Sequence, residues 1–490
     1  MKVITPTQMQ IWENRAIAAG VSVETLMRAA VAGVLQNLLK KYSPCPVEIL
    51  CGKGNNGNDG ILLGYELERR GWPVRVISTH PLQLRTPHPC AEVQSFLQRS
   101  IVWKKDALLR NKNPVLWIDV LLGLKARGEP RGAVAEILSW WKEQKRDNDI
   151  SISLDAPSGL DPEIGKEASL AFHADVTYAL GAVKNGCLRD VALPCVGQLI
   201  PVELPFGIPL GEAPVAEFQT KKTITIRPWS INIHKYKRGR VAIWAGSQYM
   251  LGAALLAARA ATRSGAGLIK LYLPENLVAH AASAVPEIIA RPVGDQLPDD
   301  FFECQAHVIG PGLGREPIVA KQLQHALTHL TQPTVLDADA LYWLAQKPEL
   351  WLLLKEPFIL TPHQGEMERL IGAPIKDRLD VVQNWLPGIS AEGVLIQKGA
   401  HTLIAKQKMA PVYNNTGHPA MATAGMGDVL SGLLGGLLAQ GYTAWDAAKL
   451  SVYWHGLAGE EAARCKGERS VIASDVIYFL GPVWNRVFQK

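Results

Sequence analysis

Residues 415–441 constrain the fold of this chain more than any other stretch, because they join a polar loop to closely spaced glycines and a long apolar helix. The pattern VLSGLLGGLLAQ repeats at helical spacing, and Gly441 stands where a C-terminal cap is expected. We therefore predict a helix that begins at Gly427 or Asp428. One face of this helix carries only small residues, namely Ser431, Gly432, Gly435, Gly436 and Ala439.

The start of this predicted helix has the features of an anion-binding site. A helix N-terminus preceded by glycines presents free backbone N–H groups and the positive end of the helix dipole, so phosphate is the first candidate ligand. Asp428 would repel a phosphate unless it has a chemical role, such as accepting a proton from an attacking hydroxyl. The alternative interpretation is that Asp428 only caps the helix.

Length, composition and charge indicate a soluble globular protein of two domains. A chain of 490 residues is too long for one ordinary core, and 48% hydrophobic with 20% charged residues is typical of a folded chain. The formal charge of +6 comes without runs of lysine and arginine. This pattern argues against a nucleic-acid partner and suits a phosphorylated small molecule.

The cysteines and the N-terminus indicate a reducing compartment. The seven cysteines are odd in number and include no C-x-x-C pair, so we expect neither a disulfide framework nor a zinc ribbon. The first residues lack the apolar core of a signal peptide, and the chain has no run of about 18 apolar residues. We therefore expect a cytoplasmic protein without a membrane partner.

The first half begins with a pattern typical of a ligand-binding α/β sheet. Helical patterns over 5–15 and 23–39 precede a strand at 47–51, the glycine-rich loop GKGNNGNDG and the helical pattern ILLGYELERRG. The loop satisfies G-x-G-x-x-G, but the acidic residue expected about 20 positions later is missing, which argues against a standard dinucleotide site. Its polar side chains favour ligand contact over a simple Asn- and Gly-rich turn: Asn55, Asn56, Asn58 and Asp59.

Two later strands of this half end in acidic residues, Asp119 and Asp155. Residues at the carboxyl ends of parallel strands converge on one crevice, and Asn56, Asp119 and Ser158 together offer hard oxygen ligands for an alkali or alkaline-earth cation. A salt-bridged structural role is the alternative for each aspartate. Lys184 follows the strand pattern DVTYAL and faces either a phosphate or solvent, and VGQLIPVELP is predicted to be the last strand of this half.

The second half starts after a linker rich in proline and glycine, with the boundary near 211–224. RVAIWAG, an alanine-rich helix and LIKLYLP form a predicted βαβ unit with parallel strands. PTVLDADAL ends a strand at Asp337 and Asp339. His363 precedes a helix that starts at Gly365 or Glu366 and is either a ligand contact or a structural histidine. GVLIQKGAHTLIAK predicts a hairpin whose turn contacts a nucleotide, and 442–490 supply covering helices.

With these motifs in view, the chain resembles the bifunctional NAD(P)H-hydrate repair enzymes of the YjeF type, from about residue 8 to the last helix. GKGNNGNDG resembles the family segment NNGGDG, and LDAPSGLD resembles IPSGLD. In the second half the matching motifs are IGPGLG, VLDADAL, LTPHQGEM, QKGAHT and TAGMGD. The resemblance implies an α/β fold, with a Rossmann-like three-layer NAD(P)HX epimerase domain over 1–215 and a ribokinase-like ADP- or ATP-dependent NAD(P)HX dehydratase domain over 225–490.

The resemblance also implies site residues, and in both halves they cluster in the motifs quoted above. In the first half the hydrated nucleotide would contact Asn55, Asn56, Gly57, Asn58, Asp59, Gly123, Leu124, Lys125, Ala126, Arg127, Gly128, Glu129 and the catalytic Asp155. A potassium ion would bind to Asn56, Asp119 and Ser158. In the second half the substrate would contact Ala253, Gly312, Gly314, His363 and the catalytic base Asp428. ADP or ATP, with Mg²⁺, would contact Lys398, Gly399, Ala400, His401, Thr402 and Gly427.

Three motifs depart from the family pattern, at four positions in all. The family's GTG reads Gly123, Leu124, Lys125, the second glycine of NNGGDG is Asn58, and GTGD has become GMGD with Met426. The first two departures keep open a first half that only senses nucleotides or binds a partner. The other alternative is a ribokinase-class small-molecule kinase with a non-catalytic nucleotide-binding N-terminal domain. The resemblance implies a homo-oligomer and leaves the choices of ADP or ATP and of NADHX or NADPHX open.

Overall fold

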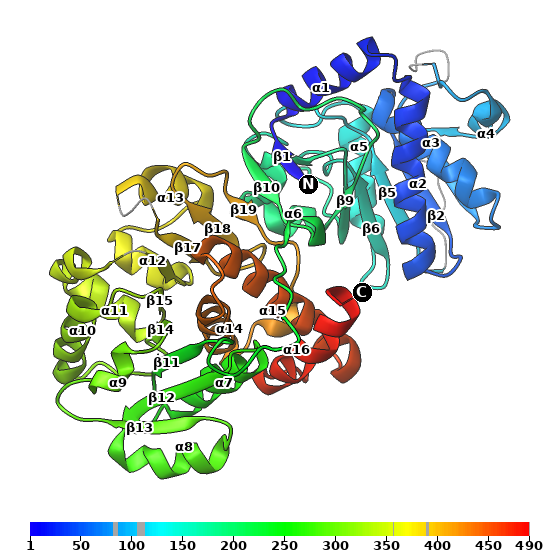
Figure 1. Cartoon of the computed structure of the whole chain (residues 1–490). Helices are drawn as coiled ribbons and strands as arrows, with labels where there is room; N and C mark the ends of the chain where they lie inside the picture. The colour runs from blue at the N-terminus through cyan, green and yellow to red at the C-terminus, as the bar shows by residue number, and fades with distance from the viewer. Residues whose placement is uncertain (82–86, 105–112, 356, 389–391, 490) are drawn as a thin grey trace. The chain divides into compact units, whose positions relative to one another are not determined.

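The computed structural model describes residues 1–81, 87–104, 113–355, 357–388 and 392–489 (Figure 1). Contacts divide the chain into two compact units, Met1–Phe218 and Gln219–Lys490. The division therefore lies within the linker predicted at 211–224. In the described ranges no helix is both long and apolar enough to cross a bilayer.

The first unit is built on a parallel sheet of seven strands (Figure 1). The strands that were predicted from apolar runs are confirmed, and most of their residues are buried because helices cover both faces. In spatial order the strands are β4 (Ile101–Val102), β3 (Val74–Ser78), β2 (Val47–Cys51), β5 (Leu116–Val120), β6 (Ile150–Leu154), β7 (Val176–Leu180) and β9 (Gln198–Val202).

Separate hydrophobic cores on the two faces of this sheet make the first unit a three-layer structure. One core joins the sheet to α2 and α3, and the other joins it to α5 through the tryptophans Trp117, Trp140 and Trp141. The predicted Rossmann-like α/β class is thus confirmed. The helices are α1 (Pro6–Ala18), α2 (Val23–Lys41), α3 (Asn55–Glu68), α4 (Gln94–Gln98), α5 (Ala133–Gln144) and α6 (Leu193–Val196).

Two predictions for this unit are wrong in detail. β9 is not the last strand, because β10 (Ala216–Phe218) returns to pair antiparallel with β1 (Lys2–Ile4), which also pairs in parallel with β8 (Val183–Lys184). A strand of three residues leaves too short a pattern to be recognised. The polar segment at 55–59 is the first turn of α3 and not a loop. Gly54 takes an extended N-cap conformation, and its carbonyl accepts the Asn58 N–H (3.1 Å).

The second unit is built on a sheet in which the neighbouring strands from β13 to β17 all pair in parallel. The predicted βαβ unit and the predicted hairpin are both confirmed, since β11 pairs in parallel with β12 and β17 pairs antiparallel with β18. In spatial order the strands are β13 (Ile289–Val293), β12 (Leu268–Pro274), β11 (Arg240–Trp244), β14 (Ala306–Ile309), β15 (Thr334–Leu336), β16 (Phe358–Leu360), β17 (Val394–Gln397), β18 (Leu403–Lys406) and β19 (Val412–Tyr413).

The helices of the second unit follow the predicted pattern, and two of them, α15 and α16, form the expected C-terminal cover. They are α7 (Leu251–Arg263), α8 (Val278–Ala284), α9 (Asp299–Phe302), α10 (Pro317–His329), α11 (Asp339–Gln346), α12 (Gln364–Ile371), α13 (Arg378–Asn384), α14 (Met426–Ala439), α15 (Ala444–Lys466) and α16 (Ala473–Val487).

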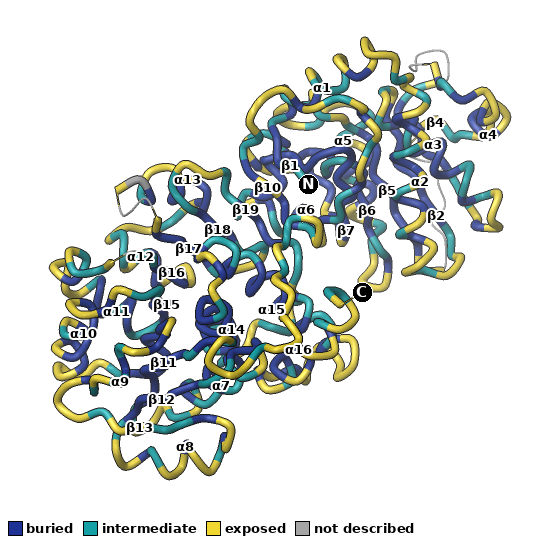
Figure 2. Tube along the Cα trace, in the orientation of Figure 1, coloured by how far each residue is buried: buried dark blue, intermediate teal, exposed yellow. Residues whose placement is uncertain are grey.

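Helix α14 lies at the centre of this unit and is buried along nearly its whole length (Figure 2). Its small face allows close packing, because a Cβ added at Gly432 would lie 2.1 Å from the Ala257 carbonyl oxygen of α7, and one at Gly435 would lie 2.3 Å from Val308 of β14. The helix begins at Met426, slightly before the predicted start, since Gly425 at φ 87° serves as its N-cap.

Candidate functional site

A cavity of about 830 Å³ opens in the first unit beside the start of α3. It is bounded by α1, α2, α3 and the loop that follows β5. Leu124 and Lys125, the two departures in that loop, form part of the wall and leave the cavity open. The site residues implied by the resemblance that line it are Asn55, Asn56, Asp59, Gly123, Leu124, Lys125, Ala126, Arg127 and Asp155.

The other residues implied for this site lie elsewhere. Gly57 and Asn58 are buried in α3, where the Cys51 thiol donates to the Gly57 carbonyl (3.2 Å) and the Asn58 amide donates to the Pro87 carbonyl (3.3 Å). Gly128 and Glu129 line an adjacent cavity of about 210 Å³. The structure therefore divides the implied set between a main cavity, a neighbouring cavity and the protein interior.

Asp155 has the most constrained conformation in the main cavity. Its φ of 71° is unusual for a residue with a side chain, and its carboxylate forms a hydrogen-bonded ion pair with Lys184. Lys184 is completely buried and also donates to the carbonyls of Leu180 (2.8 Å) and Ala182 (3.0 Å). Of the two alternatives for Lys184, contact with solvent is therefore wrong, and the buried ammonium holds the charge and position of Asp155.

Two further acidic groups in this cavity have raised pKa values. Burial raises the pKa of Asp59 well above its usual value, and the charges of Asp155 and Glu13 raise it further. Burial also raises the pKa of Glu13, again with help from Asp155. Glu13 was not predicted from the sequence, because only the folded chain brings α1 over the cavity. The site thus contains an ion-paired carboxylate next to two acids whose pKa values are raised.

Asn56, Asp119 and Ser158, the three residues implied for potassium, do come together. Asp119 is completely buried and accepts the Ser158 N–H and Oγ–H, both at 2.7 Å. Leu122 connects the set, since its N–H donates to Ser158 Oγ (3.0 Å) and its carbonyl accepts the Asn56 amide (2.7 Å). Asn56 Oδ1 is buried and has no hydrogen-bond partner in the described part of the chain.

The electrostatics of this cluster favour a cation. Burial raises the pKa of Asp119, although hydrogen bonds from Ser158 counteract the rise. In the described ranges no lysine or arginine forms an ion pair with Asp119. A buried carboxylate without a counter-ion is costly, and the free amide oxygen of Asn56 is a hard ligand. The three residues therefore fit a hard cation such as K⁺.

A second site lies in the second unit, where a buried ion pair organises it. Lys398 follows β17 and donates to Asp337 Oδ1 (2.8 Å), with Glu366 Oε2 at 3.7 Å. Asp337 follows β15 and also accepts the Ser431 hydroxyl of α14 (2.7 Å). Burial acts to lower the pKa of Lys398, but the carboxylates of Asp337 and Glu366 outweigh it and raise that pKa. A lysine that stays charged therefore lies beside α14.

Asp428, in the first turn of α14, can exchange a proton near neutral pH. Burial raises its pKa to about 7; the charge of Asp337 adds to the rise, and Lys398 opposes it. A carboxylate with such a pKa is matched to proton transfer at neutral pH. This property separates Asp428 from an acid that merely caps a helix, since a capping carboxylate is stabilised in its charged form.

The backbone at the start of α14 is open to a ligand. Among the described residues no side chain caps this N-terminus, and a Cβ added at Gly427 would lie 3.2 Å from Lys398 Nζ. Met426, which departs from the family's threonine, packs into the hydrophobic core. Free N–H groups, the helix dipole and the Lys398 ammonium together form a site for a phosphate.

The residues implied for the substrate of the second half also lie around this centre. A Cβ added at Gly312 would lie 3.1 Å from the Ala253 Cβ, and the Gly314 N–H donates to Asp339 Oδ2 (2.9 Å). Asp339 is near enough to Asp428 to raise its pKa. Gly312, Gly314 and α7 therefore lie near the same group of carboxylates as Asp428.

His363 is connected to this centre through Glu366. It is the N-cap of α12, which begins at Gln364, one residue before the predicted start. Its Nδ1 accepts the Glu366 N–H (3.3 Å), and its Nε2 lies 3.5 Å from Glu366 Oε1. The side chain is 59% exposed, so it is both a structural cap and accessible to a ligand.

The turn implied for the adenine nucleotide, residues 398–402, is held by groups that the sequence did not reveal. Arg378 of α13 is buried and donates to the Ala400 carbonyl (2.7 Å). His401 takes a positive φ of 48°, and its Nδ1 lies 3.2 Å from the Asn414 carbonyl oxygen. The Thr402 hydroxyl donates to the Gly399 carbonyl (3.0 Å). The turn is thus shaped before any nucleotide arrives.

His455 is another group that sequence reasoning missed. It lies in α15 and is 8% exposed, and its Nε2 has no hydrogen-bond partner in the part of the chain that the structure describes. Burial lowers its pKa to about 4, and the charge of Lys398 contributes. In the sequence it is one residue on the inner face of a buried helix, so no local signal marks it.

Comparisons with known proteins agree with this architecture. The chain matches the family model of the NAD(P)H-hydrate dehydratase over residues 241–479 and that of the YjeF-related protein N-terminus over residues 23–186. A crystal structure of a ribokinase-like superfamily protein from Enterococcus faecalis is 26% identical, with a TM-score of 0.50, over 56% of this chain and 98% of that one. The fold and sites thus define a two-unit α/β protein whose second unit is ribokinase-like.

The relatives identify the family. The bifunctional NAD(P)H-hydrate repair enzyme Nnr of Moorella thermoacetica is 32% identical over 88% of this chain and 86% of its own. That of Coxiella burnetii is 30% identical over 98% of each chain. The ADP/ATP-dependent NAD(P)H-hydrate dehydratase of Bacillus subtilis, co-crystallised with ATP and Mg²⁺, is 31% identical over 56% of this chain and 99% of its own, with a TM-score of 0.50. This chain belongs to the family of bifunctional NAD(P)H-hydrate repair enzymes.

Proposed function

We propose that this protein repairs hydrated nicotinamide cofactors. Residues 1–215 interconvert the R and S epimers of NAD(P)HX, and residues 225–490 dehydrate the S epimer to NAD(P)H at the expense of ADP or ATP. The observation that carries the proposal is Asp428, whose pKa is raised to about 7 by burial at the uncapped N-terminus of α14, beside Lys398. A base next to a phosphate site is the arrangement that activation of a hydroxyl by phosphorylation requires.

The dehydration begins at the hydroxyl on the reduced nicotinamide ring. Asp428 accepts the hydroxyl proton while the oxygen attacks the terminal phosphate of the nucleotide. The N–H groups at the start of α14 and the Lys398 ammonium stabilise the charge that develops on that phosphate. Phosphate is a far better leaving group than hydroxide. It departs with the C–O electron pair while the adjacent ring carbon loses a proton to solvent, and the C–H electron pair forms the ring double bond of NAD(P)H.

A divalent cation fits the charge balance of this second site. The carboxylates of Asp337, Asp339 and Glu366 all act on Asp428, whereas Lys398 is the cation that opposes them. This excess of negative charge would repel a nucleotide unless a metal enters with it. Mg²⁺ binds through phosphates and one or two carboxylates and neutralises the charge of the transferring group.

The epimerisation uses the main cavity of the first unit. Asp155, held by Lys184, is the catalytic carboxylate, and Asp59 and Glu13, whose pKa values are raised, face the same cavity. An ion-paired carboxylate beside acids with raised pKa values can supply one proton acceptor and one proton donor. Asn55, Asn56 and residues 123–127 surround the substrate.

A potassium ion fits the cluster of Asn56, Asp119 and Ser158. Two observations on the described residues support it: Asn56 Oδ1 has no hydrogen-bond partner among them, and the buried Asp119 carboxylate has no ion-pair partner among them. When bound, the ion supplies positive charge at the cavity wall, where it helps to place an anionic substrate. The family also suggests a homo-oligomer, which stays a prediction.

The experiment starts from a mixture of both epimers of NADHX. Full-length protein receives ADP, Mg²⁺ and K⁺, and recovery of dihydronicotinamide absorbance is followed faster than the epimers interconvert spontaneously. Rapid recovery of all the hydrate is the expected result. Recovery of one epimer's share alone would show that the first unit does not epimerise, and no recovery would refute the dehydratase assignment.

The same reaction mixture separates repair from an ordinary kinase. A ribokinase-class kinase would accumulate a phosphorylated product, whereas repair releases inorganic phosphate in step with the nicotinamide absorbance. Asp428→Asn is the matched control, because it keeps the shape of the site and removes the base. Parallel reactions with ADP and ATP, and with NADHX and NADPHX, determine the preferred nucleotide and substrate.

A further inference from the structure

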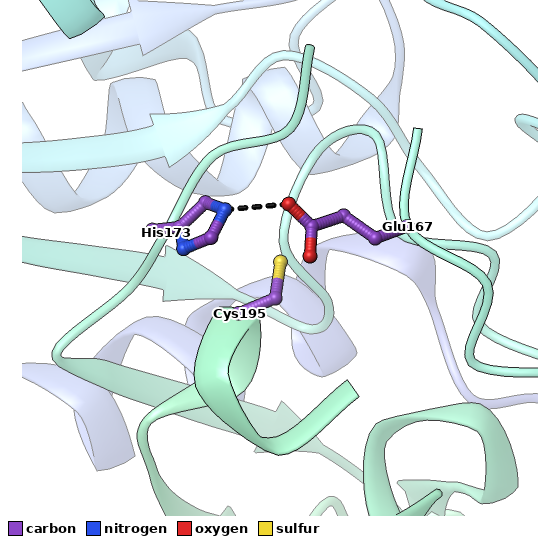
Figure 3. Close-up of side chains that lie close together, drawn as sticks. All are labelled: Glu167, His173 and Cys195. Atoms are coloured by element: carbon purple, nitrogen blue, oxygen red, sulfur yellow. Dashed lines mark hydrogen bonds and ion pairs between the residues drawn. The ribbon is translucent and has the colours of Figure 1, made fainter. Parts of the chain in front are cut away.

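Three side chains with metal-binding atoms meet in the first unit (Figure 3). None of the three is used in either proposed reaction, although Glu167 also lines the cavity of about 210 Å³. Glu167 lies in the segment between β6 and β7, His173 lies shortly before β7, and Cys195 lies in α6. Their carboxylate oxygen, ring nitrogen and sulfur atoms all lie within 4.8 Å of one another. We propose that this cluster binds a divalent transition-metal ion of the Zn²⁺ class.

The combination of ligand atoms selects the kind of metal. Thiolate sulfur and imidazole nitrogen suit Zn²⁺ and its neighbours such as Co²⁺, whereas Mg²⁺, Ca²⁺ and K⁺ prefer sites made of oxygen alone. The side chains of Glu167 (34%) and His173 (48%) are partly exposed, so solvent can complete the coordination. Three protein ligands and one water form a common tetrahedral arrangement for zinc.

The geometry needs only a small adjustment to accept an ion. His173 Nε2 and Glu167 Oε1 share a hydrogen bond of 2.6 Å. In a tetrahedral zinc site, with bonds of about 2.0–2.2 Å to nitrogen and oxygen, the same two atoms would be roughly 3.4 Å apart. The two exposed side chains therefore need to move apart by less than about 1 Å for an ion to take the place of the shared proton.

The buried ligand is already fixed next to His173. The Ala174 N–H donates to the Cys195 carbonyl (2.9 Å), and the Cys195 thiol donates to the Phe172 carbonyl (3.1 Å). Cys195 is therefore tied to the residues on both sides of His173. A rigid sulfur with two adjustable partners is an arrangement that can close around an ion without moving the backbone.

Metal binding must release a proton, which provides a distinctive signature. The Cys195 sulfur donates a hydrogen bond to the Phe172 carbonyl, so the metal-free site holds Cys–SH. When the sulfur–metal bond forms, the S–H bond breaks and the proton passes to solvent, while His173 and Glu167 bind through lone pairs. The affinity should therefore increase with pH.

An ion at this position would also fix a segment that reaches the cavities of the first unit. Ser169, between two of the ligands, donates to Glu129 through its N–H (3.0 and 3.1 Å) and its hydroxyl (2.6 Å). The Phe172 N–H donates to the Ser158 carbonyl (2.8 Å). We expect slower amide hydrogen exchange across residues 167–173 when the metal is bound.

The test uses the full-length protein, stripped of metal with a chelator and titrated with Co²⁺. Expected are one equivalent of Co²⁺ with a sulfur-to-metal charge-transfer band, displacement by Zn²⁺, and release of one proton per ion. His173→Gln and Cys195→Ser should each weaken binding by at least about 100-fold, since even outer-shell changes cost roughly 10–100-fold. Cys187→Ser, at a second buried cysteine of this unit, and Cys465→Ser, at an exposed one, are the matched controls.

The proposal stands if both ligand variants lose the cobalt band while both control variants retain it. It is overturned if the wild type shows no sulfur-to-metal band, or if His173→Gln binds Co²⁺ like the wild type. Loss of the band in Cys187→Ser with retention in Cys195→Ser would also refute it, because the sulfur ligand would then be another thiol. His173 is exposed, so its variant decides the matter even where Cys195→Ser does not fold.

Discussion

The raised pKa of Asp428 predicts that Asp428→Asn makes the second unit more stable at alkaline pH. The folded protein holds this proton up to a pH of about 7, whereas an unfolded aspartate loses it near 3.8. Between these two pH values the folded state binds one proton more than the unfolded state. The free energy of unfolding of the wild type therefore falls as the pH rises from about 3.8 to about 7. Asparagine stays neutral throughout and escapes that loss.

The magnitude follows from the size of the shift. A shift of the Asp428 pKa from 3.8 to about 7 corresponds to at most about 4.5 kcal/mol, at about 1.4 kcal/mol per pH unit. Asp428 is partly exposed, so solvent screening reduces the expected gain to about 2 kcal/mol above pH 8. Lys398 keeps its partner Asp337 in the variant, so the substitution leaves no buried charge without a counter-ion.

Urea unfolding of full-length wild type and Asp428→Asn at pH 5 and pH 8 measures the effect. The relevant transition is the one that ADP with Mg²⁺ moves to higher urea, because ligand binding to the folded second unit stabilises it. Asp295→Asn, at an exposed surface position, is the control and should show no such pH dependence. The reasoning is refuted if Asp428→Asn is less stable than wild type at pH 8, or if their difference is the same at both pH values.

Three further predictions concern packing, the first-unit ion pair and potassium. Gly432→Ala should destabilise the protein by about 1–3 kcal/mol, because the new Cβ would lie 2.1 Å from a carbonyl oxygen. Gly481→Ala, in an open helical position, should stabilise it by up to about 1 kcal/mol in the same denaturation assay. Lys184→Met leaves Asp155 unpaired and should cost roughly 3–5 kcal/mol and abolish epimerisation, while dehydration of the S epimer continues. Asp119→Asn should remove the K⁺ dependence of epimerisation in NADHX assays with and without the ion; unchanged dependence would contradict the proposed site.

Local sequence patterns predicted most of the strands and helices correctly. The apolar runs of β2, β5 and β6 are buried strands, and the small-residue face of α14 is packed against α7. Hydrophobic periodicity reports burial directly, so such elements can be recognised without a structure. The errors occurred where the pattern was short or polar, as in β10 and the first turn of α3.

The partners of the site residues could not be predicted in the same way. Glu13, Lys184, Arg378 and His455 belong to ordinary helical or strand patterns, and each acquires its role from a group far away in the chain. Their ionisation depends on burial and on neighbouring charges, both of which are properties of the folded chain. Sequence motifs therefore identified the loops of the sites, but not the residues that position these loops or shift the pKa values of their side chains.

The sequence by itself determined the two-unit α/β organisation, the buried helix after TAGMGD and the carboxylates that end the strands, because these depend on periodicity and on neighbours in the chain. Only the tertiary structure decided that Lys184 neutralises Asp155, that Gly57 and Asn58 face the interior, and that Asp428 holds a proton near neutral pH. The physical reason is that burial and charge pairing arise between elements distant in sequence, and the free energy of a charged group depends on both.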